Sequence, residues 1–350
     1  MPKIIAAAHA LPSHSPRQTE VCDSICRLFG AAHADKKQLF SIFDHSRIDQ
    51  RRFMMPLAWY MSPQSRAETS RIYQKDGFEL VYRAALSCLE KANAPAQSID
   101  HVIFVSTTGM AAPSLDAQLI NRLGLPRTAS RMPVWGLGCA GGAAGLARAA
   151  DYCRAYPRRR VLLAALECCS LTFLETDRSK KNLVASALFS DGAAAVLVDG
   201  AETDNSGPRM TASGSRLFAD SERIMGWDMV DEGLKLVLSP RLPVIVKTEL
   251  PDLIDSFLDG QGFSRDELTD YITHPGGAKV IDACRQALDL PAEALALTED
   301  HLRRYGNISS VSVLMILEKW LETKWQPGCG LGLLSAFGPG FSAEMTLLKG

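Results

Sequence analysis

Continuous apolar runs alternate along this chain with segments of helical character, and several runs end in glycine-containing turns. HVIFVSTTG (101–109) predicts a buried strand that enters a loop. A second apolar run precedes Cys139, and the small-residue segment after it (140–155) predicts a helix. RRRVLLAALECCS (158–170) and AAAVLVDG (193–200) predict two further strands. Strands that alternate with helices in this way predict an α/β fold built in layers around central sheets.

A similar order of motifs returns in the second half of the chain. LTDYITHPGG (268–277) predicts a strand entering a glycine turn, YGNISSVS (305–312) a turn before a helix, and residues 328–348 two strands around a glycine–proline turn. The polar segment AETDNSGPR separates the halves, so we expect one half over residues 1–205 and a second over residues 206–350. In each half a reactive type of residue precedes a helix with small side chains, which indicates a duplicated unit.

The charge balance and the cysteine pattern exclude several classes of protein. The 350 residues include 38 basic and 39 acidic ones, and this net charge of -1 leaves no field of one sign to attract DNA, RNA or an acidic membrane. The nine cysteines form no CxxC pair and no metal-ligand spacing, so we expect no metal site. This cysteine usage fits a reduced, cytoplasmic protein. No apolar stretch approaches the roughly 20 residues of a membrane span, so we expect no membrane anchor.

Cys139 is the strongest candidate for a nucleophile. It lies in the segment GCAGG, where small neighbours let a substrate approach the sulfur closely. A junction between a strand and a helix aims helix N–H groups at the sulfur, and their partial positive charge lowers a thiol pKa. Cysteine is also a common small residue of apolar cores, and we assign that role to most of the other eight.

Two polar residues of the second half complete the candidate site. His274 lies in THPGG, where a proline and two glycines fix the chain directly after it. Asn307 lies before a predicted helix, a position at which asparagine most often caps the helix N-terminus. A cysteine with a distant histidine and asparagine is a recurring arrangement for nucleophilic catalysis. Papain-like proteases use the same three residue types, but this chain lacks their cysteine signature.

Seven motifs, in order, resemble the type III polyketide synthases of the chalcone synthase superfamily, and the similarity covers nearly the whole chain. These motifs are VSTTG (105–109), WGLGCAGG (135–142), ALFSDGAAAVL (187–197), MGWDMVDEGLKLVLS (225–239), THPGG (273–277), YGNISSVSV (305–313) and SAFGPG (335–340). The resemblance implies a thiolase-like fold of two related halves in α-β-α-β-α layers. It also implies a homodimer that uses acyl-CoA and malonyl-CoA as substrates and needs no cofactor.

The resemblance implies a role for individual residues. Cys139 would hold the acyl group, while His274 and Asn307 would promote decarboxylation of malonyl-CoA and bind the oxyanion. Phe189 matches a gatekeeper between the CoA tunnel and the cavity. Positions that match other residues around the substrate are Thr107, Cys169, Thr172, Ala185, Gly276, Ser309, Gly338 and Pro339. Basic candidates for binding the CoA phosphates are Arg51 and Arg52, with Lys36, Lys37 and Arg47 nearby.

The stretch LECCSLTF, with NLVASALF after it, resembles the bacterial alkylresorcinol and alkylpyrone synthases. Plant members carry threonine at the position of Cys169 and glycine at that of Ala185. We therefore expect a long-chain fatty acyl starter, extended in several rounds and cyclised to an alkylpyrone or alkylresorcinol. One alternative is a short-starter or naphthalene-forming enzyme of the same family. Others are a ketoacyl synthase III-like enzyme that extends its starter once, and a non-catalytic scaffold of thiolase fold.

Overall fold

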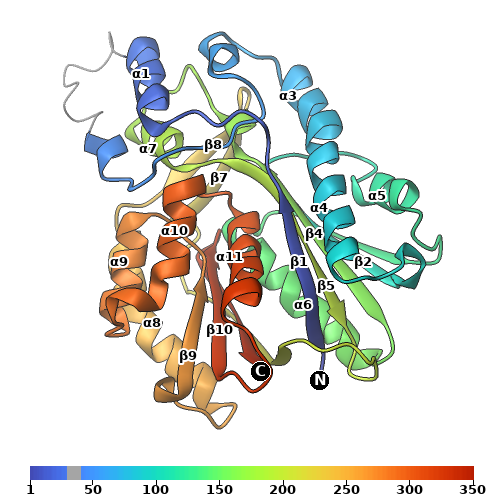
Figure 1. The fold of residues 1–350 in the computed structure, drawn as a ribbon. Coiled ribbons are helices and arrows are strands. Elements are labelled where there is room, and N and C mark those ends of the chain that lie inside the picture. Colours follow the sequence, from blue (N-terminus) through green and yellow to red (C-terminus); the bar gives the residue numbers. More distant parts are fainter. Residues whose placement is uncertain (30–40) are drawn as a thin grey trace.

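The structure, a computed structural model, describes residues 1–29 and 41–350 of the chain (Figure 1). Its strands are β1 (Lys3–Ala10), β2 (His101–Val105), β3 (Ser130–Val134), β4 (Arg160–Cys168), β5 (Asp191–Asp199), β6 (Arg209–Leu217), β7 (Met225–Val230), β8 (Gly233–Leu238), β9 (Leu268–Thr273), β10 (Leu331–Gly338) and β11 (Ser342–Lys349). Its α-helices are α1 (Gln18–Phe29), α3 (Arg66–Ile72), α4 (Phe78–Lys91), α5 (Asp116–Leu123), α6 (Gly141–Ala155), α7 (Lys180–Leu188), α8 (Leu242–Asp259), α9 (Ala278–Ala287), α10 (Ala296–Tyr305) and α11 (Ser310–Thr323).

Most of the strands belong to one large sheet, in the order β3-β2-β4-β5-β1-β6-β11-β10-β9. Strand β1 pairs with β5 from Lys3 to Ala10, but it meets β6 only where Lys3 pairs with Arg209. The sheet therefore has a part from the first half of the chain and a part from the second half, joined at one narrow contact.

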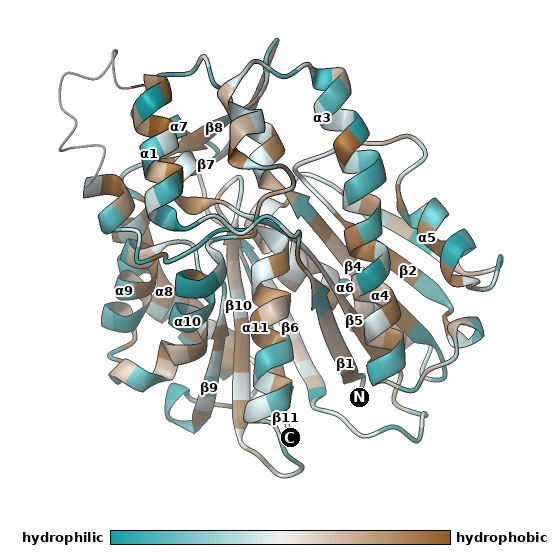
Figure 2. Cartoon of the chain, turned by 45° about the horizontal axis from the view of Figure 1, so that its top comes forward, coloured by the Kyte–Doolittle hydropathy of each residue, from teal (hydrophilic) through white to brown (hydrophobic). Residues whose placement is uncertain are grey.

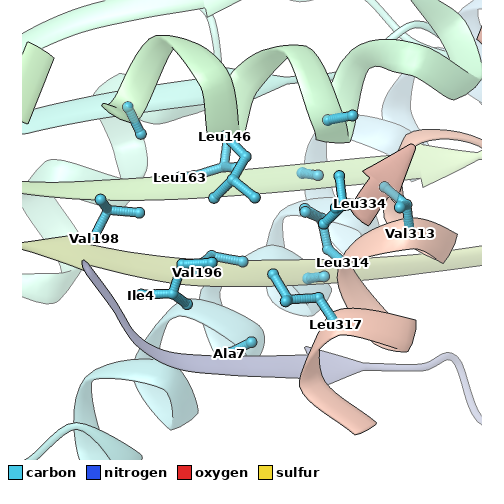
Figure 3. Packing of buried hydrophobic residues seen from close by; sticks show 14 of the residues in the cluster. Ile4, Ala7, Leu146, Leu163, Val196, Val198, Val313, Leu314, Leu317 and Leu334 are labelled. Atoms are coloured by element: carbon cyan, nitrogen blue, oxygen red, sulfur yellow. The ribbon is translucent and has the colours of Figure 1, made fainter. Parts of the chain in front are cut away.

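Helices α6 and α11 lie between these two parts of the sheet. The core around them combines Leu146 of α6, Leu314 of α11, Leu163 of β4 and Leu334 of β10 (Figure 3). Helix α4 covers the outer face of the first part, and α8 with α9 covers that of the second. The viewer-facing sides of α4 and α5 carry hydrophilic residues, as amphipathic outer helices should (Figure 2). The layered α-β-α-β-α arrangement expected from the sequence is confirmed.

The helical segment that begins with α3 and ends with α4 is divided. A π-helical turn, Tyr73–Gly77, connects α3 to α4. A side chain at Gly77 would begin 3.2 Å from Leu166 and 3.3 Å from the sulfur of Cys168, so glycine lets the turn lie close against β4.

Two features of the fold have no counterpart among the expected elements. Strand β6 pairs along β11, and β7 pairs with β8 in a separate two-stranded sheet.

No helix in the described part of the chain is long and apolar enough to cross a bilayer.

Candidate active site

Cys139 and Asn307 meet at the N-terminal ends of the two central helices. Cys139 lies in a 3-10 turn, Gly138–Ala140, that leads directly into α6, and Asn307 lies between α10 and α11. The thiol donates a long hydrogen bond of 4.0 Å to the Oδ1 atom of Asn307, and both residues are buried. The fold thus brings the predicted nucleophile and the predicted amide together.

The carboxamide of Asn307 has a fixed orientation. Its Oδ1 atom accepts a 2.7 Å hydrogen bond from the backbone N–H of Ser309, a residue whose φ is positive, at 49°. The backbone of Asn307 is held on both sides, since its N–H donates to Leu188 at 2.9 Å and its carbonyl accepts from Ser190 at 2.8 Å. The Nδ2 donors form no hydrogen bond to a described residue, so they remain available to a substrate oxygen.

His274 follows directly after β9, as the sequence predicted. Its backbone N–H donates to the Ser335 carbonyl at 2.8 Å, and Gly276 closes the turn by donating to the His274 carbonyl at 3.0 Å. Both ring nitrogens are buried, and neither has a hydrogen-bond partner in the described part of the chain. An imidazole without internal partners can accept a proton from a reacting group and later donate it.

The pKa shifts at the site differ from what the motif around Cys139 suggested. Burial raises the pKa of the Cys139 thiol to about 12, although the interactions with the side chains of Ser309 and Asn307 act in the opposite direction. Burial also lowers the pKa of His274 to about 3. In the free enzyme, desolvation therefore favours the neutral thiol of Cys139 and the neutral imidazole of His274.

The loop after β10 packs tightly on the turn that carries Cys139. A side chain at Gly138, whose φ is 46°, would begin 2.7 Å from Pro339, and one at Gly338 would begin 2.5 Å from Ala140. Glycine at both positions therefore permits the close approach. In this way SAFGPG and GCAGG form one rigid wall of the site.

A residue near the site that the sequence reasoning missed is Glu167, close to the end of β4. Its carboxylate is fully buried and accepts hydrogen bonds from Ser310 Oγ at 2.6 Å, Thr108 Oγ at 2.7 Å and the N–H groups of Thr107 and Thr108. Thr107 Oγ in turn accepts from the Gly138 N–H at 3.0 Å. Glu167 therefore connects the turn before Cys139 to the start of α11. The available signal was an acidic residue inside the apolar run VLLAALECC.

Two cavities adjoin the site. The lining of the first cavity is mainly apolar and includes four of the predicted positions, Cys169, Thr172, Ala185 and Phe189. Residues of α1 and the side chains of Leu57, Met61 and Phe173 complete this lining. The second cavity is lined by Thr107, Pro339 and the hairpin β7–β8. Gly276, Ser309 and Gly338 line neither cavity and shape the turns around the site instead.

Trp227 was also missed, although it lies in the motif MGWD. It lines both cavities, and its ring centroid lies 6.0 Å from that of Phe189. Phe189 forms a parallel β-bridge with Asn307. The backbone of the predicted gatekeeper is therefore paired with the backbone of the residue that carries the predicted catalytic carboxamide.

The basic candidates for CoA phosphates differ in their surroundings. Arg51 is only 1% exposed and lines the first cavity, which argues against the predicted contact with CoA phosphates. Arg52 is partly exposed, and its Nε atom has no partner among the described residues. Lys36 and Lys37 lie outside the described residues. Among the residues that are described, no group of three or more potential ligands could hold a metal ion.

Comparison with known proteins identifies the family. The family models for the N-terminal and C-terminal domains of chalcone and stilbene synthases match residues 2–203 and 209–350. These limits lie close to the division that we expect between residues 205 and 206, which stays a prediction.

Relatives with similar sequences extend over nearly the whole chain. A putative chalcone synthase of Bacillus subtilis is 36% identical, over 99% of this chain and 98% of its own. A 1,3,6,8-tetrahydroxynaphthalene synthase of Streptomyces peucetius is 38% identical, over 99% and 92%. The crystal structure of the Streptomyces coelicolor enzyme of that name, a bacterial type III polyketide synthase, superposes with a TM-score of 0.94 at 29% identity and covers 99% of both chains. This chain therefore belongs to the chalcone and stilbene synthase family and is a type III polyketide synthase of thiolase-like fold.

Proposed function

We propose that this synthase holds an acyl starter on Cys139 and extends it by repeated decarboxylative condensation with malonyl-CoA. The observation that carries the proposal is the convergence of a buried thiol with an oriented carboxamide, next to an apolar cavity. His274 supplies the base, since both of its ring nitrogens are without partners in the described part of the chain.

Loading begins when His274 takes the proton of Cys139 and the sulfur attacks the carbonyl carbon of the acyl-CoA. The carbon–sulfur bond to CoA breaks, and the CoA thiolate leaves with the proton from the imidazole. Desolvation opposes charge separation in the free enzyme. The proton transfer is therefore expected to accompany binding of the thioester rather than precede it.

Extension begins when malonyl-CoA loses CO2. The electrons of the broken carbon–carbon bond form an enolate, and Asn307 Nδ2 with His274 donates hydrogen bonds to its oxygen. The enolate carbon then attacks the thioester on Cys139, and the sulfur leaves as a thiolate. Transfer of the longer chain back to Cys139 permits another round.

For the starter, we propose a long-chain fatty acyl group whose tail occupies the first cavity, with cyclisation to an alkylpyrone or alkylresorcinol. The lining supports a tail, because Val21, Ile25, Leu57, Met61 and Phe173 are apolar. Cys169 and Ala185 are small side chains in the same lining.

A second candidate is a short-starter enzyme that forms a naphthalene. Three of the similar curated proteins, from Streptomyces peucetius, Streptomyces coelicolor and Streptomyces griseus, bear the name 1,3,6,8-tetrahydroxynaphthalene synthase. Membership of the chalcone and stilbene synthase family argues against the single-extension alternative and against a non-catalytic scaffold.

We further propose a cytoplasmic homodimer that binds CoA without a resident cofactor. Met110 is 57% exposed and Trp135 is 49% exposed, and they follow the neighbouring parallel strands β2 and β3. Two exposed apolar side chains close to one edge of the sheet support an interface between subunits. Among the described basic candidates, Arg52 is the one that we propose for a CoA phosphate.

The proposal is tested with purified enzyme, malonyl-CoA and acyl-CoAs from two to eighteen carbons (roughly the span of common acyl chains that an apolar cavity could receive). We expect products extended by more than one malonyl unit, with the highest rates for long starters. If the enzyme forms the same product from malonyl-CoA alone as it does when an acyl-CoA starter is added, the naphthalene-forming candidate is favoured. A single extension with every starter would contradict both.

A further inference from the structure

A buried positive charge lies in the wall of the first cavity, whose lining is mainly apolar but also includes neutral polar side chains such as Tyr60 and Asn182. Among the described residues that line it, Arg51 is the only one with a formal charge at neutral pH. Its side chain is 1% exposed, and its guanidinium carbon lies 5.3 Å from the ring centroid of Phe53. A cation is expensive in such a place unless a neighbouring group compensates it.

The contacts of Arg51 are all to neutral acceptors. Its Nε atom donates to Ser190 Oγ at 3.1 Å, and its Nη1 atom donates to the Ser186 carbonyl at 2.9 Å and to Gln18 Oε1 at 3.4 Å. Its Nη2 atom makes no hydrogen bond to a residue that the structure describes. Two N–H donors of a buried guanidinium are therefore left for a ligand.

Asp191 is close enough to influence Arg51, but its carboxylate is already engaged. The oxygens accept from Met54 N–H at 2.7 Å, from Ser170 N–H at 2.7 Å and from the Ser170 hydroxyl. Burial lowers the pKa of Arg51 to about 9, and Asp191 acts against that shift, so the guanidinium stays protonated at neutral pH. The arginine therefore offers a permanent charge without a directly bound counterion among the described residues.

We propose that Arg51 forms an anion subsite in this cavity, so that long-chain starters with a distal carboxylate, the ω-carboxyacyl-CoAs, bind there in preference to their neutral counterparts. This inference rests on the proposed function, in which the acyl tail of the starter occupies the first cavity. The free Nη2 donors bind the carboxylate, and the apolar walls take the methylene groups between the two ends.

The position of the cavity limits which starters can use this subsite. Cys169 and Phe189 line the cavity, and Phe189 pairs with Asn307 beside Cys139. We therefore expect a chain attached to Cys139 to enter the cavity near these residues and to extend from there toward Arg51. Only carboxylates at a suitable distance from the thioester can meet the guanidinium, so the preference has to peak at particular chain lengths.

The test measures acylation of Cys139 by intact-protein mass spectrometry in the absence of malonyl-CoA. It uses ω-carboxyacyl-CoAs of increasing length, each paired with its neutral methyl ester. We expect the acid to react at least tenfold faster than its ester at one or two neighbouring lengths. Arg51→Met should abolish that ratio, and Arg51→Lys should retain part of it.

Lys180→Met is the matched control, because it removes an exposed cation from α7, a helix that also lines the cavity. Its acid-to-ester ratio should equal that of the unchanged enzyme.

The Arg51 side chain packs near Gly306, so Arg51→Met could fail to fold. In that case the dependence of the acid-to-ester ratio on chain length in the unchanged enzyme tests the subsite. A ratio without a peak in chain length overturns the subsite while leaving the proposed function intact, as does a peak that survives in Arg51→Met. Failure of every acyl-CoA to label Cys139 overturns the proposed function and the subsite together.

Discussion

Asn307 and Cys139, which are 168 positions apart in the chain, are connected by a 4.0 Å contact between the carboxamide oxygen and the thiol. Because Ser309 also donates to this oxygen, the carboxamide nitrogen is the end that can reach a substrate. Asn307→Ala should therefore remove an oxyanion donor and slow malonyl-CoA decarboxylation by about 100- to 1,000-fold, or roughly 2.7–4 kcal/mol. Release of CO2 from malonyl-CoA measures this effect.

Acyl loading on Cys139 serves as the control for this variant. We expect Asn307→Ala to load a starter within about tenfold of the unchanged rate, since loading depends on the thiol and the base. Decarboxylation at the normal rate in Asn307→Ala would remove its assigned role. Cys139→Ala should lose loading altogether.

The burial of Cys139 and His274 predicts how thiol reactivity depends on pH. With a thiol pKa of about 12, the thiolate fraction should rise about tenfold per pH unit over the range that the protein tolerates. Alkylation of Cys139 by iodoacetamide, followed by peptide mapping, should therefore increase from pH 6 to pH 9 without a plateau. A plateau that begins below pH 7 would instead indicate a stable ion pair with His274, whose pKa would then lie far above about 3.

The strands that could be predicted from the sequence are those buried on both faces. Residues of β4 and β5 are almost completely buried, so they appear in the sequence as continuous apolar runs. Strand β6 has the mixed sequence RMTASGSRL and an irregular burial pattern, and its partner β11 lies more than a hundred positions later. Pairing at such a distance leaves no local pattern by which the strand could be recognised.

The residue types at the candidate site could be predicted, but their electrostatics could not. The glycines around Cys139 indicated a position where the chain approaches a neighbour closely, and Pro339 is that neighbour. The pKa of the thiol depends on burial by segments remote in the chain, so the local motif gave the wrong direction. Glu167 was missed because its hydrogen-bond donors lie 59 to 143 positions away.

Gly306 should be among the least tolerant positions near the site. Its φ is 71°, and a side chain there would begin 2.9 Å from the Leu188 carbonyl oxygen and 2.9 Å from Ser190 Oγ. Gly306→Ala therefore adds a steric clash to the backbone strain, and we expect it to lower the free energy of unfolding by more than 2 kcal/mol (about the upper range for backbone strain alone). Urea denaturation measures the change.

Gly328→Ala provides the matched control, because its φ is 82° and no described residue lies within 4 Å of the added carbon. We expect the free energy of unfolding of this variant to fall by only about 1 kcal/mol, which is the strain of the left-handed conformation. Equal losses in the two variants would show that the contacts around Gly306 relax, and that Asn307 is not held as firmly as its two backbone hydrogen bonds suggest.

Cys169→Phe should change the chain-length preference of loading, because a phenyl ring at this position takes up space in the first cavity. We expect the ratio of long-chain to short-chain acylation of Cys139 to fall at least tenfold, with short starters affected little. Cys169→Ser, which keeps the size of the side chain, should retain the original ratio. Both ratios come from competing acyl-CoAs in one reaction, read by intact mass, so a general loss of active protein cancels. An unchanged preference in Cys169→Phe would mean that the starter tail lies outside this cavity.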